Sequence, residues 1–136
     1  MSDCIRFTIP AVPVAQPRAR ATAINGHARM YEAAGKHPIH AFKAIAKLMA
    51  SQAYNGPPLE GPLAVSLEFV FACKSKRERK PKATRPDNDN LAKGLLDSLN
   101  GLLYLDDGQV CDLRVTKWHA KGDEQPHVVV EVRRLP

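Results

Sequence analysis

The stretch RPDNDNLAKGLLDSLNGLLYLDDGQV, residues 85–110, predicts a helix that is followed by an acidic turn. Its leucines recur at steps of three and four residues, which places them on one face of an α-helix. Asp87 or Asn88 is suited to cap the first helical amides. The pair Asn100-Gly101 is a typical C-terminal stop, and Asp106-Asp107-Gly108 has the composition of a turn.

Outward from this helix, the apolar pattern changes to strict alternation, which is typical of half-buried strands. Four strands are predicted, at residues 3–9, 63–73, 110–118 and 127–135. An amphipathic pattern over residues 37–56 predicts the other main helix. We therefore expect an α+β fold, with a single mixed sheet of about four strands packed with two main helices, in one domain spanning residues 1–136.

Two connections complete this outline. Lys121-Gly122-Asp123 is suited to a hairpin turn between the last two strands. Residues 11–36 hold prolines, an Asn-Gly pair and scattered cations, and they predict a long irregular segment with a short strand near Arg29–Tyr31. Long loops within a compact domain are usually functional or mobile.

The composition narrows the class of partner. The 136 residues carry 20 Lys and Arg against 14 Asp and Glu, a net charge of +6. This excess suits nucleic acid, although a membrane surface or an acidic protein has the same attraction. The three cysteines are far apart and form no C-x-x-C motif, so we expect a reducing compartment with all three buried. No apolar run resembles a signal peptide or a membrane span, which indicates a cytoplasmic protein with no membrane partner.

Four carboxylates are concentrated around the central helix, at Asp87, Asp89, Asp106 and Asp107. Each pair has an ordinary explanation, since aspartates cap helices and form turns. A strand–helix–strand crossover, however, can bring the turn back beside the loop that precedes the helix. Unit charges about 4 Å apart repel by about 4 kcal/mol at an effective dielectric near 20, so such a cluster needs a cation. Oxygen ligands alone favour Mg²⁺ or Mn²⁺ over zinc.

Lys93 follows Asp89 by four residues and therefore lies on the same helix face. As a surface ion pair, the two side chains would contribute only about 0.3–0.5 kcal/mol. Beside a metal, the same ammonium would face a scissile phosphate and stabilise the developing charge. The mid-helix Gly94 costs roughly 0.5–1 kcal/mol against alanine, and a close approach of DNA or of a second subunit would account for it. Carboxylates, a lysine and flanking cations together predict a phosphodiester-cleaving site.

Two segments, RPDNDNLAKGLLDSL (residues 85–99) and YLDDGQVCDLRVTK (residues 104–117), resemble the RusA family of Holliday-junction resolvases. That family shows a basic residue, then D-x-D-N-L-x-K, and then D-D-x-Q-V. PVAQPRAR, residues 13–20, is a weaker echo of the P-x-x-x-x-R-x-R stretch of many phage-type members. The resemblance implies a homodimeric, Mg²⁺-dependent endonuclease that resolves four-way DNA junctions by paired nicks in recombination and repair. Mn²⁺ is the alternative metal, and no small-molecule cofactor is implied.

The resemblance also implies roles for individual residues. Asp87, Asp89 and Asp107 match the essential acidic positions, which would hold the metal. Lys93 matches the catalytic lysine, and Asp106 is the neighbouring acid of the catalytic set. The candidates for DNA contact are basic residues matched by character rather than by spacing: Arg18, Arg20, Lys76, Arg77, Arg79, Arg85 and Lys117.

Two other functions fit the same residues. A broader metal-dependent DNA nuclease, including one that cuts flaps, would use the same carboxylates and lysine. A catalytically silent protein would bind junctions with acids that are only structural.

Asn90 matches the asparagine of the motif and is expected to support the helix or the site. Two symmetric nicks need two acidic clusters, which a twofold dimer supplies, and the strands near residues 63–73 and 110–118 are candidates for its interface.

Overall fold

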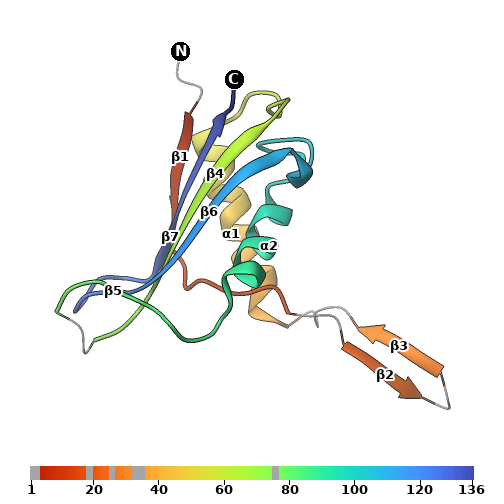
Figure 1. Cartoon of the computed structure of the whole chain (residues 1–136), viewed down its shortest axis with the longest axis vertical. Coiled ribbons are helices and arrows are strands. Elements are labelled where there is room, and N and C mark those ends of the chain that lie inside the picture. Colours follow the sequence, from red (N-terminus) through yellow and green to blue (C-terminus); the bar gives the residue numbers. More distant parts are fainter. Residues whose placement is uncertain (1–3, 18–19, 25–26, 32–35, 75–76) are drawn as a thin grey trace.

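A five-stranded mixed sheet forms the centre of the computed structural model, which describes residues 4–17, 20–24, 27–31, 36–74 and 77–136. Across the sheet the strands run in the order β1, β7, β4, β6, β5 (Figure 1). Their bounds are Cys4–Ile9 for β1, His127–Arg134 for β7, Leu63–Phe71 for β4, Val110–His119 for β6 and Lys80–Pro81 for β5. With the helices α1 (Pro38–Ala53) and α2 (Asn88–Ser98), they form the α+β fold that the periodicity predicts.

The sheet has five strands rather than about four because the basic loop supplies a short edge strand. β5 is only two residues long, and it pairs antiparallel with the end of β6. A second, two-stranded sheet is formed by β2 (Arg20–Ile24) and β3 (His27–Tyr31), which Figure 1 shows apart from the five-stranded sheet. β3 contains the short strand predicted near Arg29–Tyr31, whereas its partner β2 was not predicted.

The central helix lies in a crossover between two parallel strands. β4 and β6 are parallel neighbours, and α2 lies between them in the chain. Leu63 pairs with Val110 and Phe71 with His119, so both strands start at the same end of the sheet. The chain must therefore return along α2 in the opposite direction. Asn88, at the start of α2, accordingly donates its side-chain amide to the carbonyl of Val115 in the second half of β6, at 3.4 Å.

The hairpin predicted between the last two strands is wrong, because β4 lies between β6 and β7. β4 is parallel to β6 and antiparallel to β7. Its core face is apolar, and on the opposite face Ala64 and Val70 are also buried. A strand with apolar residues on both faces is suited to the middle of a sheet. The turn at Gly122 (φ 48°) is present, but it joins two strands that are not neighbours.

One face of the sheet carries the core and packs against both helices (Figure 1). β1 and β7 alternate as expected, with every second residue buried. The helices present the faces that the three- and four-residue steps predict. Together the buried set from the strands is Ile5, Phe7, Ile9, Leu63, Val65, Leu67, Phe69, Val128, Val130 and Val132, and from the helices Ile39, Phe42, Ala46, Ala50, Leu91, Ala92, Leu95 and Leu96.

At Gly94, α2 lies close to two other segments of the chain. A Cβ at this position would lie 3.1 Å from Cδ1 of Ile39 in α1 and 3.4 Å from the backbone nitrogen of Gln16. The close approach that we expected from DNA or from a second subunit is thus made by α1 and by the segment that follows β1. That segment is also tied to α2 by a hydrogen bond from the Gln16 amide to the Asn90 carbonyl, at 3.0 Å.

The prediction that all three cysteines are buried is wrong. Cys4 and Cys111 are exposed and Cys73 is half-buried. Cys4 alternates with the buried Ile5, so strand register decides its exposure and residue type does not. Within the described residues, neither helix has the length and apolar composition needed to cross a membrane.

Candidate active site

The first acidic pair lies at the start of α2. Asp87 occupies the N-cap position with extended backbone angles, but its side chain makes no capping hydrogen bond. Asp89 is exposed in the first helical turn, where its Oδ1 accepts a hydrogen bond from the Asn90 amide at 3.0 Å. The capping explanation therefore does not account for the Asp87 carboxylate. Both acids lie where the helix dipole favours negative charge, so the fold tolerates them there.

The loop that delivers Asp87 is held by β6. The Lys117 ammonium donates to the Thr84 carbonyl at 2.6 Å and to the Pro86 carbonyl at 2.7 Å. The Lys82 amide donates to the Lys117 carbonyl at 3.0 Å. The peptide bond between Arg85 and Pro86 is cis. The second half of β6 thus determines where the start of α2 lies.

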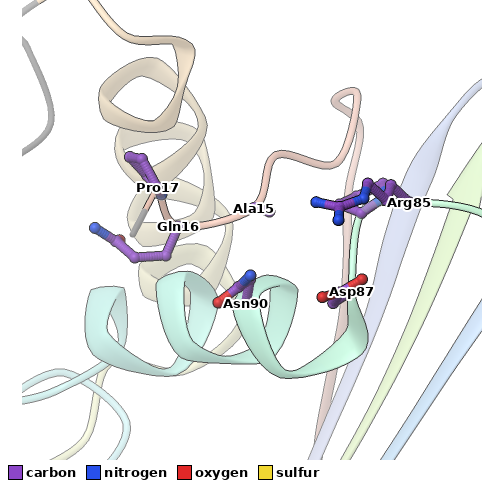
Figure 2. A pocket seen from close by; sticks show the side chains of 7 residues that line it. Ala15, Gln16, Pro17, Arg85, Asp87 and Asn90 are labelled. Atoms are coloured by element: carbon purple, nitrogen blue, oxygen red, sulfur yellow. The ribbon is translucent and has the colours of Figure 1, made fainter. Parts of the chain in front are cut away.

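A pocket of about 420 Å³ opens beside this helix start (Figure 2). In Figure 2, Arg85 and Asp87 lie at one end of the pocket and Gln16 at the other, with Asn90 between them. The Gln16 Oε1 is buried and has no hydrogen-bond partner within the described part of the chain. The lining residues are Ala15, Gln16, Pro17, Arg85, Pro86, Asp87 and Asn90. Asp87 of the first acidic pair therefore borders a concave, mainly apolar surface and not a flat one.

The second acidic pair belongs to a tightly bonded turn. Asp106 caps the 3₁₀ turn Asp107–Gln109, and its Oδ2 accepts from the Gly108 amide at 3.0 Å. The Gln109 Oε1 accepts in return from the Asp106 amide at 3.0 Å. The Gln109 Nε2 donates to the carbonyls of Leu59 (2.9 Å) and Gly61 (3.0 Å), just before β4. The Asp106 carboxylate is thus used to shape the turn, which leaves Asp107 to face α2.

Asp107 meets an acid that the sequence interpretation missed. A hydrogen bond with Asp97 of α2, partial burial and the charges of Asp97 and Asp106 raise the pKa of Asp107, whereas Lys93 lowers it. Asp97 follows Lys93 by four residues, so Asp89, Lys93 and Asp97 form a stripe along one helix face. That spacing was the signal that could have identified Asp97.

A buried tyrosine, Tyr104, connects the turn that carries Asp106 and Asp107 to α2. Tyr104 is fully buried, and its hydroxyl donates to the Leu96 carbonyl of α2 at 2.7 Å. Burial, followed by the charges of Asp107, Asp97 and Asp106, raises the pKa of Tyr104 well above its ordinary value. The tyrosine is therefore a neutral hydrogen-bond donor that joins the turn to the C-terminal half of α2.

The turn was expected beside the loop that precedes α2, but it meets the second half of the helix instead. Lys93, Asp97 and Asp107 come together there, while Asp87 and Asp89 stay at the helix start. At 1.5 Å per residue, the Cα atoms of Asp89 and Asp97 are about 12 Å apart along the helix axis. Within the described residues, no group of three or more His, Cys, Asp and Glu side chains has the geometry of a metal site. The carboxylates thus form two groups along α2: Asp87 and Asp89 precede Lys93, and Asp97 with Asp107 follows it.

The basic residues fall into three groups. Arg18 and Lys76 lie outside the described residues, and of Arg20 only the backbone in β2 is described. Arg77 and Arg85 are exposed, the latter beside the pocket. Lys117 and Arg79, in contrast, are bonded within the chain, the former to the two carbonyls above.

Arg79 is the centre of an ion-pair network at the far end of the sheet. Its Nε lies 3.1 Å from each carboxylate oxygen of Glu124, and one Nη lies 2.6 Å from Glu124 Oε2. Its other Nη contacts Glu68 of β4. The Arg79 guanidinium holds the pKa of Glu124 at about 2. This network joins the basic loop to the β6–β7 connection, so a contact of Arg79 with DNA stays a prediction that competes with a structural role.

Comparison with known proteins agrees with the motif. The sequence pattern of the family described as Endodeoxyribonuclease RusA matches residues 10–133, which is most of the chain. The chain is similar to the uncharacterized protein YqaN of Bacillus subtilis (strain 168), with 37% identity over 145 aligned positions and 98% of each chain covered. It is also similar to the crossover junction endodeoxyribonuclease RusA of Lactococcus phage r1t, with 28% identity over 131 positions and 95% of each chain covered. The chain therefore belongs to the RusA family of endodeoxyribonucleases.

Proposed function

We propose that this endonuclease resolves four-way DNA junctions in recombination and repair, by hydrolysis that depends on a divalent cation and uses the acids and lysine along α2. The observation that carries the proposal is the stripe Asp89–Lys93–Asp97, with Asp107 folded against its C-terminal end. Further support comes from the phage relative, which is named a crossover junction endodeoxyribonuclease and is covered over 95% of its length.

The carboxylates have the chemistry that Mg²⁺ or Mn²⁺ requires, because they offer only oxygen ligands. In our proposal, Asp87 and Asp89 offer carboxylate ligands for a divalent cation at the start of α2, and Asp107, with Asp97 beside it, offers them at the second half of the helix. The mutual approach of Asp97 and Asp107 supports this, since two like charges are best held together by a cation between them. Once bound, such a cation would lower the pKa of water and neutralise charge on the phosphate.

Lys93 lies between the two acidic pairs along the helix, and it is exposed. We assign it to the scissile phosphate, where an ammonium stabilises the charge that develops on the phosphoryl oxygens. Asp106 orients Asp107 through the turn, because its own carboxylate is bonded to the Gly108 amide. Asn90 joins the helix to the segment before β2, since its carbonyl accepts from the Gln16 amide. Its side chain borders the pocket next to Asp87.

Symmetric resolution of a junction needs two sites, which a twofold homodimer would supply. The sheet face opposite the helices offers polar and charged side chains from β4, β6 and β7, including Ser66, Arg114 and Glu131. We propose that residues 1–136 act as one domain in each subunit.

The exposed Arg77 and Arg85, with Arg18, Arg20 and Lys76, are assigned to the DNA backbone, where each phosphate contact adds to the salt dependence of binding.

A cleavage assay on matched substrates tests this function. A synthetic four-way junction and a linear duplex of the same arm sequence are incubated with Mg²⁺, with Mn²⁺ or with a chelator. Paired nicks in the junction alone, and only with a divalent cation, are the expected result. Equal cutting of both substrates would favour a broader nuclease, and tight junction binding without cutting in either cation would favour a catalytically silent protein.

A further inference from the structure

Lys117 has a different position from the other basic residues of the motif region. It lies in β6, next to Phe69 of β4, and its side chain is half-buried rather than exposed. The ammonium donates to two backbone carbonyls, those of Thr84 at 2.6 Å and Pro86 at 2.7 Å. A lysine that contacts phosphate from a surface keeps its head group in water. Lys117 instead directs two of its three N–H groups into its own chain.

The two carbonyls flank Arg85, and the second immediately precedes Asp87. Both residues line the pocket beside the start of α2 (Figure 2). The ammonium therefore fixes the backbone on both sides of Arg85. The second carbonyl that it binds belongs to Pro86, the residue directly before Asp87. The backbone that Lys117 holds therefore also carries the Asp87 side chain.

Other contacts of β6 act on the same segment and strengthen this reading. The Lys82 amide donates to the Lys117 carbonyl at 3.0 Å, and Pro81 of β5 pairs with Trp118. On the helix side, the Asn88 side chain donates to the Val115 carbonyl at 3.4 Å. These contacts attach the chain to β6 before residue 84 and after residue 86. The Lys117 side chain attaches residues 84–86 to the same strand.

We propose that Lys117 is a positioning residue, whose ammonium clamps the carbonyls of Thr84 and Pro86 and thereby sets the place of Arg85 and Asp87 in the site. The inference rests on the proposed function, because it assigns a purpose to the fixed position of Asp87. It also separates Lys117 from the residues that we assign to the DNA backbone. Groups that orient metal-binding side chains from behind typically change metal affinity about 10–100-fold when they are removed.

Lys117→Met tests the clamp, because methionine keeps most of the stem and removes every donor. Lys121→Met is the matched control, since Lys121 is exposed in the turn between β6 and β7. Three quantities are measured for each variant: junction affinity without metal over a range of salt, Mn²⁺ affinity by calorimetry, and the single-turnover cleavage rate. Amide hydrogen exchange of the peptide covering residues 82–90 reports the backbone directly.

For Lys117→Met we expect the salt slope of junction binding to fall by no more than the single phosphate contact assigned to Arg85, about 0.9 log unit. Mn²⁺ affinity should fall about tenfold or more. The cleavage rate at saturating Mn²⁺ should fall by up to about 100-fold, which a misplacement of roughly 1 Å can cause. Exchange should rise in residues 82–90 and stay unchanged in α1. Lys117→Arg keeps the charge and several donors, and it should recover part of both the Mn²⁺ affinity and the rate.

Two results would overturn the clamp. A reduced salt slope, with Mn²⁺ affinity, cleavage rate and exchange all equal to those of the control, would mean that Lys117 contacts a phosphate and positions nothing. Unchanged Mn²⁺ affinity, rate and exchange would mean that the two hydrogen bonds position nothing. If Lys117→Met does not fold, Lys117→Gln, whose shorter stem does not bring a donor to both carbonyls, carries the same measurements, and unchanged Mn²⁺ affinity, rate and exchange in that variant would contradict the proposal. A wild-type protein that cuts no junction would count against the proposed function, whereas the exchange and Mn²⁺ measurements would still decide on the clamp.

Discussion

Asp107 in the turn before β6 and Asp97 in the second half of α2 hold their carboxyl groups within hydrogen-bonding reach of each other. The two residues are ten positions apart, and the buried Tyr104 between them ties the turn to the helix. The charge of Lys93 also acts on Asp107, whose pKa it lowers. The contact therefore joins the D-D-x-Q-V part of the motif to the helix face that carries the D-x-D-N-L-x-K part.

Asp97→Asn should stabilise the metal-free protein and weaken its response to divalent cations. Removal of one of two neighbouring like charges should raise the free energy of unfolding by up to about 1 kcal/mol, the usual limit for partly exposed charge pairs. Thermal unfolding with and without Mn²⁺ measures both effects. A cation-induced rise in melting temperature equal to that of the wild type would show that Asp97 takes no part in cation binding.

Asp89→Asn should abolish junction cutting and leave junction binding intact or stronger. The change removes a proposed metal ligand, and it also removes a negative charge that repels the phosphate backbone. Gel-based cleavage and binding assays on the same junction measure the two effects separately. Asp123→Asn, which removes an exposed acid from the β6–β7 turn, is the matched control and should cut at the wild-type rate. Wild-type cutting by Asp89→Asn would exclude Asp89 from the site.

Arg77 and Arg79 should behave differently when each is replaced by alanine, although only one residue separates them. Arg77 is exposed, so its loss should weaken junction binding and flatten the salt dependence by about 0.9 log unit. Arg79 is paired with Glu124 and Glu68, so its loss should lower stability by on the order of 1 kcal/mol, after allowance for its partial exposure. Binding titrations over salt and chemical denaturation distinguish the two. The same change of salt slope in both variants would mean that the network opens to bind DNA.

Acidification should remove the contribution of the Glu124–Arg79 pair. The folded-state pKa of Glu124 is about 2, below the ordinary value of 4.5, so the folded protein favours the charged form. The stabilisation is therefore fully present above about pH 4.5 and is lost as the pH falls through 2. The difference in unfolding free energy between the wild type and Glu124→Gln should be constant from pH 7 to 5 and shrink below that. A difference that stays constant down to pH 2 would contradict the lowered pKa.

The elements that sequence periodicity identifies correctly are those whose apolar faces repeat over at least one full element. α1, α2, β1, β4 and β7 meet this condition, and their buried faces follow the predicted steps. β6 is a strand as predicted, but none of its residues is buried. β5 could not be recognised, because two residues of a lysine-rich loop carry no period. The hairpin error has another cause: a local turn signal at Gly122 contains no information about which strand fills the space between β6 and β7.

For the candidate site, residue spacing located the acids but not their partners. The four-residue step from Asp89 to Lys93 was interpreted correctly as one helix face, and the same step continued to Asp97. Lys117 resembled any other cation of the region, because nothing in the sequence predicts that two carbonyls 31 and 33 residues earlier accept its hydrogen bonds. Burial of the cysteines was predicted from residue type, whereas register alone decided it for Cys4.

The alignment of Asp89, Lys93 and Asp97 on one face of α2 also restricts which insertions and deletions the chain can accept. One inserted or deleted residue between Asp89 and Asp97 would turn everything beyond it by about 100° around the helix and move Asp97 away from Asp107. Seven inserted residues would restore the angle but lengthen the helix by roughly 10 Å, past the span that β4 and β6 set. Homologues should therefore keep the number of residues between these two aspartates constant.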